Sequence, residues 1–402
     1  MSETLLFQLG RERRLALAEL AAVVAPLGQL KDGSAQTALI QFEKEVDPPE
    51  LQDRLGGVIK IGRILAKLPL TATRNELGLS LYQDLHRRPI RDFGISFIDG
   101  HWSKQDRDQL GLFVKRQVKN SGGAVRFVSG SETQLPSVLV RDQLLGRGRE
   151  YLIVWTSEAI VIGETITVQA WKSWSVRDFD RPARDPRRGM LPPKLARMMI
   201  NLGQFTPETT ILDPFCGVGT VLQEALLLGH KHVLGSDRNE LALAATKANL
   251  DWLQVHFATK IGTIRLIQSS VESLQEQQIR TEAPLGIVSE ADLGPPDLVR
   301  LTPTARKERF LPLMTRYTNW LEALFGLLNQ GERCVLAYPI LRDPETALPV
   351  VEAAEKMGWQ IQSVIPEAWL MHPATEGRRT PIVTYARPDQ LVGRQIVVLK
   401  KT

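Results

Sequence analysis

The 402-residue sequence predicts an α/β protein in which an α+β region precedes a doubly wound, mostly parallel sheet. Two observations predict that sheet. From about residue 190 onward, apolar runs of strand length alternate with amphipathic helical segments. One of these runs ends in an aspartate that is followed by a Gly-x-Gly turn and a helical segment. Such a strand–turn–helix unit borders a ligand crevice at the carboxyl edge of a parallel sheet.

Residues 1–75 are expected to form a first α+β domain. Residues 5–9, 38–42 and 58–65 have the apolar pattern of strands. Gly56-Gly57 marks the end of the second of two expected helices. Those helices are predicted over 14–24 and 49–55. This order of elements is that of a ferredoxin-like unit.

Residues 76–170 are expected to form a second α+β domain, whose regular structure begins near residue 90 and ends in a hairpin. Its predicted strands are 93–97, 124–128, 151–155 and 159–168, and its predicted helices are 107–118 and 137–145. Residues 171–193 are rich in Arg, Pro and aromatic residues and have little periodicity. They are therefore expected to form a linker.

Residues 194–402 are expected to form the doubly wound domain. A helix over 194–202 follows Pro193, a residue that suits the first turn of a helix. After the strand that ends at Asp213, the predicted strands are 231–235, 264–268, 285–290, 333–338, 360–365 and 395–400, and the predicted helices are 221–228, 240–253, 315–328 and 348–357. Two or three domains also fit the length of the chain, which exceeds what one core accommodates.

The composition is that of a globular protein, with 43% hydrophobic and 24% charged residues. The two cysteines, Cys216 and Cys334, are too few for a disulfide framework or a zinc cluster, so a reducing, cytoplasmic setting is expected. The histidines lack metal-binding spacing, and no metal is expected. No apolar run approaches the length that crosses a bilayer, and the first residues lack a signal-peptide pattern, so no membrane association is expected.

Charge is unevenly distributed along the chain. Residues 51–200 hold 25 Lys and Arg against 15 Asp and Glu, an excess of 10 positive charges. Residues 201–300 hold 7 against 12, an excess of 5 negative charges. A basic module beside a neutral or acidic one suggests a polyanionic substrate that the first module holds and the second modifies. The alternative is a solvated basic surface without a partner.

The segment Ile211–Thr220 reads Ile-Leu-Asp-Pro-Phe-Cys-Gly-Val-Gly-Thr. Gly217 and Gly219 let the backbone approach a ligand closely. Asp237 ends the next apolar run, where a carboxylate accepts both hydroxyls of an adenosine ribose. A nicotinamide site would need a third glycine where Leu222 stands. The expected cofactor-binding residues are Asp213, Pro214, Phe215, Gly217, Gly219, Thr220, Asp237, Arg238 and Ser270.

This loop, Asp-Pro-Phe-x-Gly-x-Gly-Thr followed by Gly-Ser-Asp, resembles that of S-adenosylmethionine-dependent amino-methyltransferases. Further matching segments are 6–11, 55–60, 125–128, 181–185 and 189–194. Together they resemble tRNA guanosine-N2 methyltransferases, in which a ferredoxin-like and THUMP region precedes a class I methyltransferase domain. The resemblance implies S-adenosylmethionine as cofactor, tRNA as partner of the THUMP region, and methylation of the exocyclic N2 amine of a guanosine.

The end of the fourth strand departs from this family, in which it carries Asp-Pro-Pro-Tyr. Here Glu290 stands in place of the aspartate and Leu293 in place of the aromatic residue, an arrangement more similar to a bacterial subgroup with an altered fourth-strand motif. A carboxylate and a carbonyl that accept the two amine N–H groups would localise the nitrogen lone pair. Glu290 is the first candidate for that carboxylate and Asp292 the second. The expected catalytic residues are Glu290, Asp292, Gly294 and Pro295.

Arginines of the linker and of the second domain are expected to bind RNA phosphates. The expected RNA-binding residues are Arg126, Arg177, Arg181, Arg184, Arg187, Arg188 and Lys194. The alternative is that the linker arginines pair with its aspartates. Trp320 and Trp369 are candidates for stacking on an extruded base, although core positions are favoured for both.

Two competing functions remain open at this point. A degenerate member of the family would bind RNA and cofactor without transferring methyl groups, and the altered fourth-strand motif favours it. An amino-methyltransferase could instead act on DNA or on a protein, because the cofactor loop does not identify the acceptor. A homodimer or a small activator subunit is also left open.

Overall fold

The computed structural model describes residues 3–184, 190–257, 262–280, 282–378 and 380–402. The described residues form two compact units. Unit 1 comprises residues 3–20, 24–171 and 367–378, and unit 2 comprises the remaining described residues. A short segment near the C-terminus is therefore part of the unit that the N-terminal residues build.

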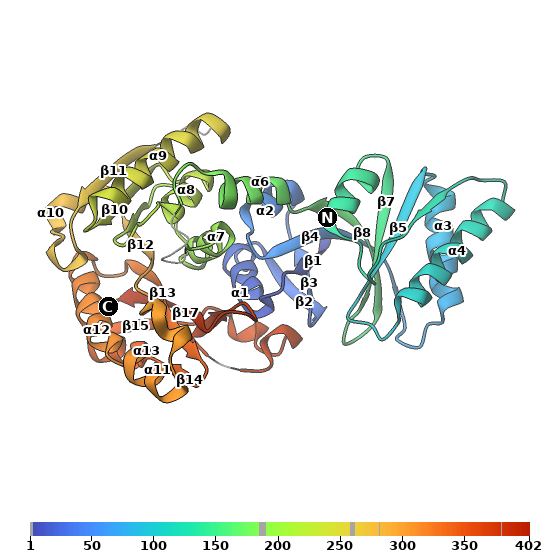
Figure 1. Cartoon of the computed structure of the whole chain (residues 1–402). Coiled ribbons are helices and arrows are strands. Elements are labelled where there is room, and N and C mark those ends of the chain that lie inside the picture. Colours follow the sequence, from blue (N-terminus) through green and yellow to red (C-terminus); the bar gives the residue numbers. More distant parts are fainter. Residues whose placement is uncertain (1–2, 185–189, 258–261, 281, 379) are drawn as a thin grey trace. The chain divides into compact units, whose positions relative to one another are not determined.

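Unit 1 contains one eight-stranded sheet of order β2-β3-β1-β4-β8-β7-β5-β6 (Figure 1). Its strands are β1 (Glu3–Leu9), β2 (Gly28–Ser34), β3 (Thr37–Phe42), β4 (Val58–Leu68), β5 (Asp92–Ile98), β6 (Arg126–Val128), β7 (Gly148–Trp155) and β8 (Ile160–Val168). Its helices are α1 (Arg13–Val24), α2 (Pro48–Arg54), α3 (Arg74–Arg87), α4 (Lys104–Asn120), α5 (Ser137–Leu139), η1 (Val140–Leu144), η5 (Glu367–Trp369) and η6 (Pro373–Thr375). Antiparallel pairing of β4 with β8 makes one continuous sheet through both expected α+β domains.

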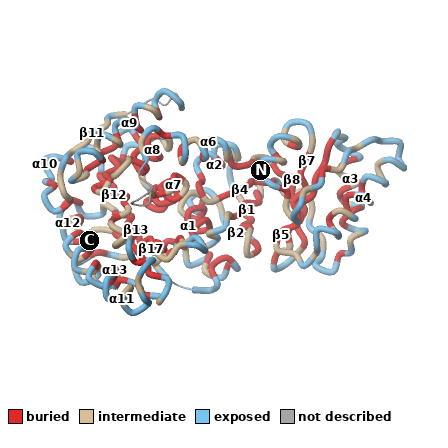
Figure 2. Tube along the Cα trace, viewed as in Figure 1, coloured by how far each residue is buried: buried red, intermediate tan, exposed pale blue. Residues whose placement is uncertain are grey.

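Helices α3 and α4 pack against each other and cover one face of the strands around β5 and β7 (Figure 1). Each begins with a capping box, in which Thr73 with Glu76, and Ser103 with Asp106, satisfy backbone N–H groups reciprocally. Leucines at helical spacing on α3 are buried against this face, whereas other positions of the helix are exposed (Figure 2). They are Leu77, Leu81 and Leu85.

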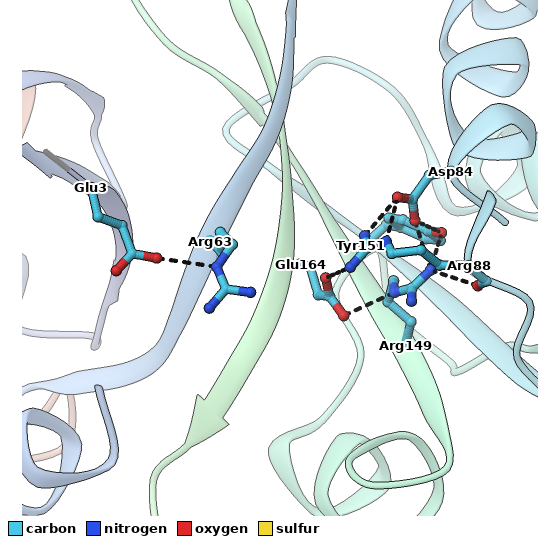
Figure 3. Close-up of polar contacts among 7 residues, drawn as sticks. All are labelled: Glu3, Arg63, Asp84, Arg88, Arg149, Tyr151 and Glu164. Atoms are coloured by element: carbon cyan, nitrogen blue, oxygen red, sulfur yellow. Dashed lines mark hydrogen bonds and ion pairs between the residues drawn. The ribbon is translucent and has the colours of Figure 1, made fainter. Parts of the chain in front are cut away.

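A polar cluster ties α3 to β7 and β8 (Figure 3). Arg149 donates to Asp84 Oδ2 at 2.6 Å and to Glu164 Oε1 at 2.8 Å, and Arg88 donates to the same two carboxylates. The buried Tyr151 hydroxyl donates to Asp84 Oδ2 at 2.6 Å. Because both carboxylates serve both arginines, this cluster fixes α3 on the sheet and leaves little of its charge for an external anion.

A buried ion pair lies in the middle of the same sheet. Lys60 Nζ on β4 donates to Glu150 Oε1 on β7 at 2.6 Å, and both side chains are almost fully buried. Glu150 also accepts from Ser96 and Thr165, and Lys60 donates to the carbonyl of Leu135. These added hydrogen bonds compensate for the desolvation of the two charges. The network therefore joins the strands of both α+β regions to the loop before α5.

Residues 367–378 pack on the β2–β3 hairpin within unit 1. The His372 ring is buried, its Nε2 lies 2.9 Å from the carbonyl oxygen of Thr37, and its Nδ1 accepts from the backbone N–H of Ala374. Nε2 therefore carries the proton and donates, because Nδ1 is the acceptor. Burial lowers the pKa of His372, while the Thr37 bond and Asp32 act in the opposite direction.

We expect unit 1 to lose stability as the pH falls below 6.5 because of His372. The folded state favours the neutral ring, so the unfolded state takes up a proton first. The contribution is complete above the ordinary histidine pKa of about 6.5 and is lost as the pH falls through it. Urea unfolding at pH 7.5 and 5.5 should show a larger fall for the wild type than for His372→Gln. An equal fall in both proteins would contradict this assignment.

Unit 2 contains a nine-stranded sheet of order β11-β10-β9-β12-β13-β17-β15, with β14 paired to β13 and β16 to β17. Its strands are β9 (Thr210–Asp213), β10 (His232–Asp237), β11 (Thr263–Gln268), β12 (Leu285–Glu290), β13 (Arg333–Arg342), β14 (Glu345–Ala347), β15 (Trp359–Gln362), β16 (Ile382–Tyr385) and β17 (Val392–Lys401). The strands from β11 to β13 are parallel, and β17 is antiparallel to β13. Chain order reverses between β9 and β12, so the ligand crevice belongs at the carboxyl ends of these strands.

The helices of unit 2 flank this sheet. They are α6 (Trp171–Ser175), η2 (Val176–Asp180), α7 (Pro193–Leu202), α8 (Thr220–Leu227), α9 (Glu240–Phe257), η3 (Val271–Ser273), α10 (Glu276–Ile279), η4 (Pro296–Arg300), α11 (Pro303–Phe310), α12 (Leu313–Leu327) and α13 (Val350–Lys356). Helix α7 is buried along nearly its whole length (Figure 2). The prediction of a doubly wound sheet after residue 190 is confirmed.

Candidate active site

The turn between β9 and α8 forms the floor of a cavity at the carboxyl edge of the sheet of unit 2. Gly217 and Gly219 have positive φ angles of 53° and 79°, which residues other than glycine rarely adopt. A Cβ on Gly219 would lie 2.8 Å from Thr246 Cγ2, so this glycine also allows α9 to pack closely. A Cβ on Gly217 would meet only the Phe215 carbonyl oxygen within 4 Å, so its backbone is open to a ligand.

Asp237 lies at the end of β10, beside this turn. Its Oδ2 accepts from the backbone N–H of Gly217 at 3.1 Å and its Oδ1 from that of Asn239 at 2.9 Å. These two bonds orient the carboxylate without neutralising it, and each oxygen keeps a further lone pair. Asp237 is partly exposed and lines the cavity, as expected for a residue that binds ribose hydroxyls.

Asp213 ends β9 beneath the turn and is buried. Its Oδ1 accepts from the Ser289 hydroxyl at 2.5 Å and from the backbone N–H of Phe215 at 3.2 Å. Burial, reinforced by the charges of Asp237 and Glu290, raises the pKa of Asp213 to about 7. Asp213 therefore shapes the turn from below and has a reduced negative charge at neutral pH.

The end of β12 brings Glu290 into the same cavity. Glu290 is nearly buried, and its carboxylate pairs with the guanidinium of Arg394 on β17. Arg394 Nε donates to Oε1 at 2.5 Å, whereas Nη2 lies 3.4 Å from Oε2. Oε2 thus has the weaker bond and keeps acceptor capacity. Burial raises the pKa of Glu290, and Arg394 acts in the opposite direction.

Both carboxylate oxygens of Asp292, the second candidate for the catalytic carboxylate, already have partners. Its Oδ1 accepts from the backbone N–H of Gly294 at 2.8 Å, and its Oδ2 pairs with Arg316 at 2.7 Å. Its backbone carbonyl accepts from the Tyr317 hydroxyl. Gly294 has a φ of 101°, so Asp292 and Gly294 together hold the turn that follows β12. This turn, together with Pro295, lines the cavity.

Sequence reasoning missed four residues of the site: three that line the cavity, and Arg394, which contacts Glu290. Arg394 was not considered, because it is 104 positions from Glu290. Glu272 also lines the cavity and accepts from Trp320 Nε1 at 2.9 Å, so a carboxylate is present just after Ser270, where no acid was expected. Arg316 packs over the Trp320 ring at 4.9 Å. Asn239, the fourth, follows Arg238 and accepts from the backbone N–H of Leu241 at the start of α9.

Trp320 lies at the cavity wall and also in the core. It packs edge-on against Phe215, with ring centroids 4.9 Å apart, and is nearly buried. It therefore supports Phe215 of the glycine turn. Trp369, the other candidate for base stacking, is buried in unit 1.

Two arginines that were expected to bind RNA are buried in unit 2. Arg177 donates to Glu224 Oε1 at 2.6 Å, and its guanidinium lies 4.1 Å from the Trp174 ring centre. Arg181 donates to the hydroxyl of Thr220 at 2.7 Å. Both side chains thus hold the segment before α7 against α8, which corrects the expectation that they contact phosphates.

The other expected RNA contacts are placed differently. Lys194 is largely covered, and burial lowers its pKa. Arg184 is exposed, lines the cavity and packs against the exposed Phe179 ring. Arg126 of unit 1 is also exposed, whereas Arg187 and Arg188 lie outside the described residues.

These features fit a nucleoside cofactor. The cavity has a volume of about 1360 Å³, larger than a single nucleoside needs. Its lining includes the turn at Gly217, the carboxylates of Asp237 and Glu272, and the end of β12. Of the remaining expected contacts, Pro214, Thr220, Arg238 and Ser270 also line it, whereas Gly219 does not. One end therefore suits the cofactor and the other, at Glu290, suits an acceptor.

Comparison with known families decides the class of this site. Residues 181–286 match the family model described as the RMKL-like methyltransferase domain. Unit 2 contains a methyltransferase domain. The match covers the segment from Arg181 through β9, α8, β10, α9 and β11 to the first residues of β12. It confirms the prediction of a methyltransferase domain in this part of the chain and supports S-adenosylmethionine as its cofactor.

The chain is also similar to proteins of known name. It is 28% identical over 186 residues to the tRNA (guanine(10)-N2)-dimethyltransferase of Pyrococcus abyssi, a match that covers 46% of each chain. The chain thus matches about half the length of this relative. Two solved structures share its fold. TrmN from Thermus thermophilus has a TM-score of 0.55 and 15% identity, over 99% of this chain and 100% of that one. SMU.472, a putative methyltransferase complexed with SAH, has a TM-score of 0.53 and 11% identity, over 100% of this chain and 98% of that one.

Among the described residues, no helix is long and apolar enough to cross a membrane, and no group of His, Cys, Asp and Glu side chains could hold a metal ion. Cys216 and Cys334 are both free and buried. Burial raises the thiol pKa of each, so neither is an activated nucleophile.

We expect Asp237→Ala to weaken binding of S-adenosylmethionine by about 1–3 kcal/mol, the cost of losing a charged hydrogen-bond acceptor. Calorimetric titration measures the change. Asp251→Ala is the matched control, because Asp251 forms an exposed pair with Lys247 on α9. Equal affinities of all three proteins would remove Asp237 from the cofactor site.

Proposed function

We propose that this protein transfers the methyl group of S-adenosylmethionine to the N2 amine of a guanosine in tRNA. The observation that carries the proposal is the single cavity that joins the glycine turn to the carboxylate of Glu290. The name of the similar relative supports guanine N2 as the acceptor and nucleotide 10 as its position. A tRNA substrate also supports the expected cytoplasmic location.

The chemistry follows from the position of Glu290. The lone pair of a guanine amine is delocalised into the ring, so the amine is a poor nucleophile. A charged Glu290 that accepts one amine N–H localises this lone pair toward the methyl donor. When the nitrogen–carbon bond forms and the carbon–sulfur bond breaks, the nitrogen loses a proton, which Glu290 Oε2 accepts. The sulfonium cofactor supplies the methyl group, and the protein supplies alignment.

An acceptor base must leave its helix to reach Glu290. Leu293, in the turn after β12, offers only an apolar contact, because it replaces the family's aromatic residue. Phe179 is 57% exposed, and Arg184 packs on it at 5.4 Å beside the cavity. We propose that this pair stacks on an unpaired nucleotide, since aromatic and guanidinium planes both do so.

In unit 1 we propose that RNA phosphates contact an arginine row, defined as Arg91, Arg126 and Arg147. Strands β5, β6 and β7 are parallel, with Asp92 registered against both Arg126 and Gly148, so these exposed arginines lie at the aligned starts of three neighbouring strands. Arg126 is half exposed even though it pairs with Asp92 at 2.8 Å. The row is a cluster of positive charge suited to a nucleic-acid backbone.

We expect replacement of the arginine row by glutamine to weaken tRNA binding by at least about tenfold and to reduce the slope of log K against log salt by about one per lost contact. Filter binding at several salt concentrations measures both. Arg63→Gln is the control, because Arg63 is a similarly exposed arginine of unit 1 that pairs with Glu3 (Figure 3). Equal slopes for both variants would exclude the row as an RNA contact.

The activity itself is tested with labelled S-adenosylmethionine and bulk tRNA, followed by mass spectrometry of the digested nucleosides. We expect N2-methylguanosine or its dimethyl form, and none with Gly217→Arg, whose side chain would enter the cofactor site. Activity of the chain alone would show that no activator subunit is required. Cofactor binding without methyl transfer would favour a catalytically degenerate protein that binds RNA and cofactor. Transfer to DNA or protein in place of tRNA would favour an amino-methyltransferase with one of those acceptors.

A further inference from the structure

The Glu290–Arg394 pair is unusual among the ion pairs of unit 2 because it lies at the acceptor end of the cavity and spans three strands. Glu290 on β12 is registered with Ala337 on β13, and Arg394 on β17 with Pro339. Ala337 and Pro339 are two positions apart on β13, so Glu290 and Arg394 lie on the same face of the sheet, on either side of that strand. Arg394 is 3% exposed and Glu290 is little more accessible.

The other charged and titratable groups around Glu290 do not stabilise its negative charge. Asp213 on β9 and Asp292 in the following turn carry the same sign of charge. Tyr317 on α12 brings no positive charge, since burial raises the pKa of its hydroxyl, and this hydroxyl donates to the Asp292 carbonyl. Arg316 is engaged with Asp292. Among the described residues, Arg394 is therefore the cation that is paired directly with the Glu290 carboxylate.

We propose that Arg394 is a positioning residue of the methyltransferase site, which keeps the Glu290 carboxylate ionised and oriented toward the acceptor amine. This inference rests on the proposed function and assigns the last strand of the sheet a part in it. A protonated Glu290 would donate rather than accept, and could neither localise the amine lone pair nor take its proton. Arg394 itself does not contact the acceptor.

The first test compares the pH profile of kcat for the wild type and Arg394→Gln with tRNA as substrate. Without the guanidinium, burial favours the neutral carboxyl, so the acidic limb should move to higher pH and kcat at pH 7 should fall about 10²-fold. Affinity for S-adenosylmethionine should remain within about twofold. Arg394→Lys should restore part of the rate and return the limb toward its original position.

A matched control removes another arginine–glutamate pair of unit 2. Arg280 donates to both oxygens of Glu332, at 3.0 and 2.9 Å, away from the cavity. Arg280→Gln should lower thermal stability without moving the pH profile. If Arg394→Gln behaved in the same way, with an unchanged acidic limb, Arg394 would be purely structural and the inference would be overturned.

A second measurement does not require an active enzyme. Carbon-13 NMR of labelled glutamate carboxyl groups, with the signal assigned through Glu290→Gln, follows the charge of Glu290 directly. We expect this carboxyl to titrate at a higher pH in Arg394→Gln than in the wild type, and at an intermediate pH in Arg394→Lys, which serves alone if the first variant does not fold. Titration at the wild-type pH in both variants would overturn the inference even if transfer to tRNA were not observed, whereas failure of transfer alone would overturn only the proposed function.

Discussion

Glu290→Gln should lower kcat for transfer to tRNA by about 10²–10⁴-fold while binding of S-adenosylmethionine is largely kept. Glutamine retains the shape of the side chain, but it cannot accept a proton at neutral pH. The predicted cofactor contacts, Gly217 in the turn after β9 and Asp237 at the end of β10, are not altered by this change. Single-turnover kinetics and calorimetry on the same preparation separate the two effects.

The same substitution leaves Arg394 without its charged partner, so a loss of stability must be measured alongside the rate. Asp292→Asn is the comparison that distinguishes the two carboxylates. Asp292 is already engaged with Gly294 and Arg316, so we expect this variant to retain most of the rate. A large loss in Asp292→Asn with an active Glu290→Gln would transfer the catalytic role to Asp292.

The largest expected effect on stability comes from Glu224 on α8. Its Oε1 accepts from Arg177 at 2.6 Å and its Oε2 from Arg197 at 2.8 Å, and all three side chains are buried. Glu224→Gln would leave two buried guanidinium groups without their carboxylate. Removal of one partner from a buried charge network typically costs about 3–5 kcal/mol.

Chemical denaturation monitored by circular dichroism measures this change in the free energy of unfolding. Glu208→Gln is the matched control, because Glu208 forms an exposed pair with Lys231 in the same unit. The control should have the unfolding midpoint of the wild type. If Glu224→Gln also had the wild-type unfolding midpoint, the ion pairs of Arg177 and Arg197 with Glu224 would not stabilise the fold, and their proposed structural role would fail.

Most of the residues predicted to bind the cofactor line one cavity, and the sequence could group them because they are close together in the chain. Strand β9, the two glycines and Asp237 lie within the 28 residues 210–237, and the glycines and the aspartate each meet a conformational or chemical requirement that only a few residue types meet. The strands of both sheets were largely recognised for a similar reason, since runs such as 285–288 contain no polar side chain.

The acceptor side was predicted less completely because its contacts are distant in the sequence. Nothing local to Glu290 indicates Arg394, and arginine is usually a surface residue, which is why Arg177 and Arg181 were assigned to RNA. Helix α3 was missed although Thr73 and Glu76 form a capping box at its start. Strand β2 was missed because its sequence, Gly-Gln-Leu-Lys-Asp-Gly-Ser, is mostly polar.

The inclusion of residues 367–378 in unit 1 has a consequence for biosynthesis. The ribosome makes these residues only after residues 172–366 of unit 2, so the β2–β3 hairpin waits for the ring of His372 until most of that unit has been made. To replace unit 1 by that of a related chain, residues 367–378 would have to be exchanged together with the N-terminal part. A protease cut at residue 171 would leave these residues on the C-terminal fragment, so it would not separate the two units cleanly.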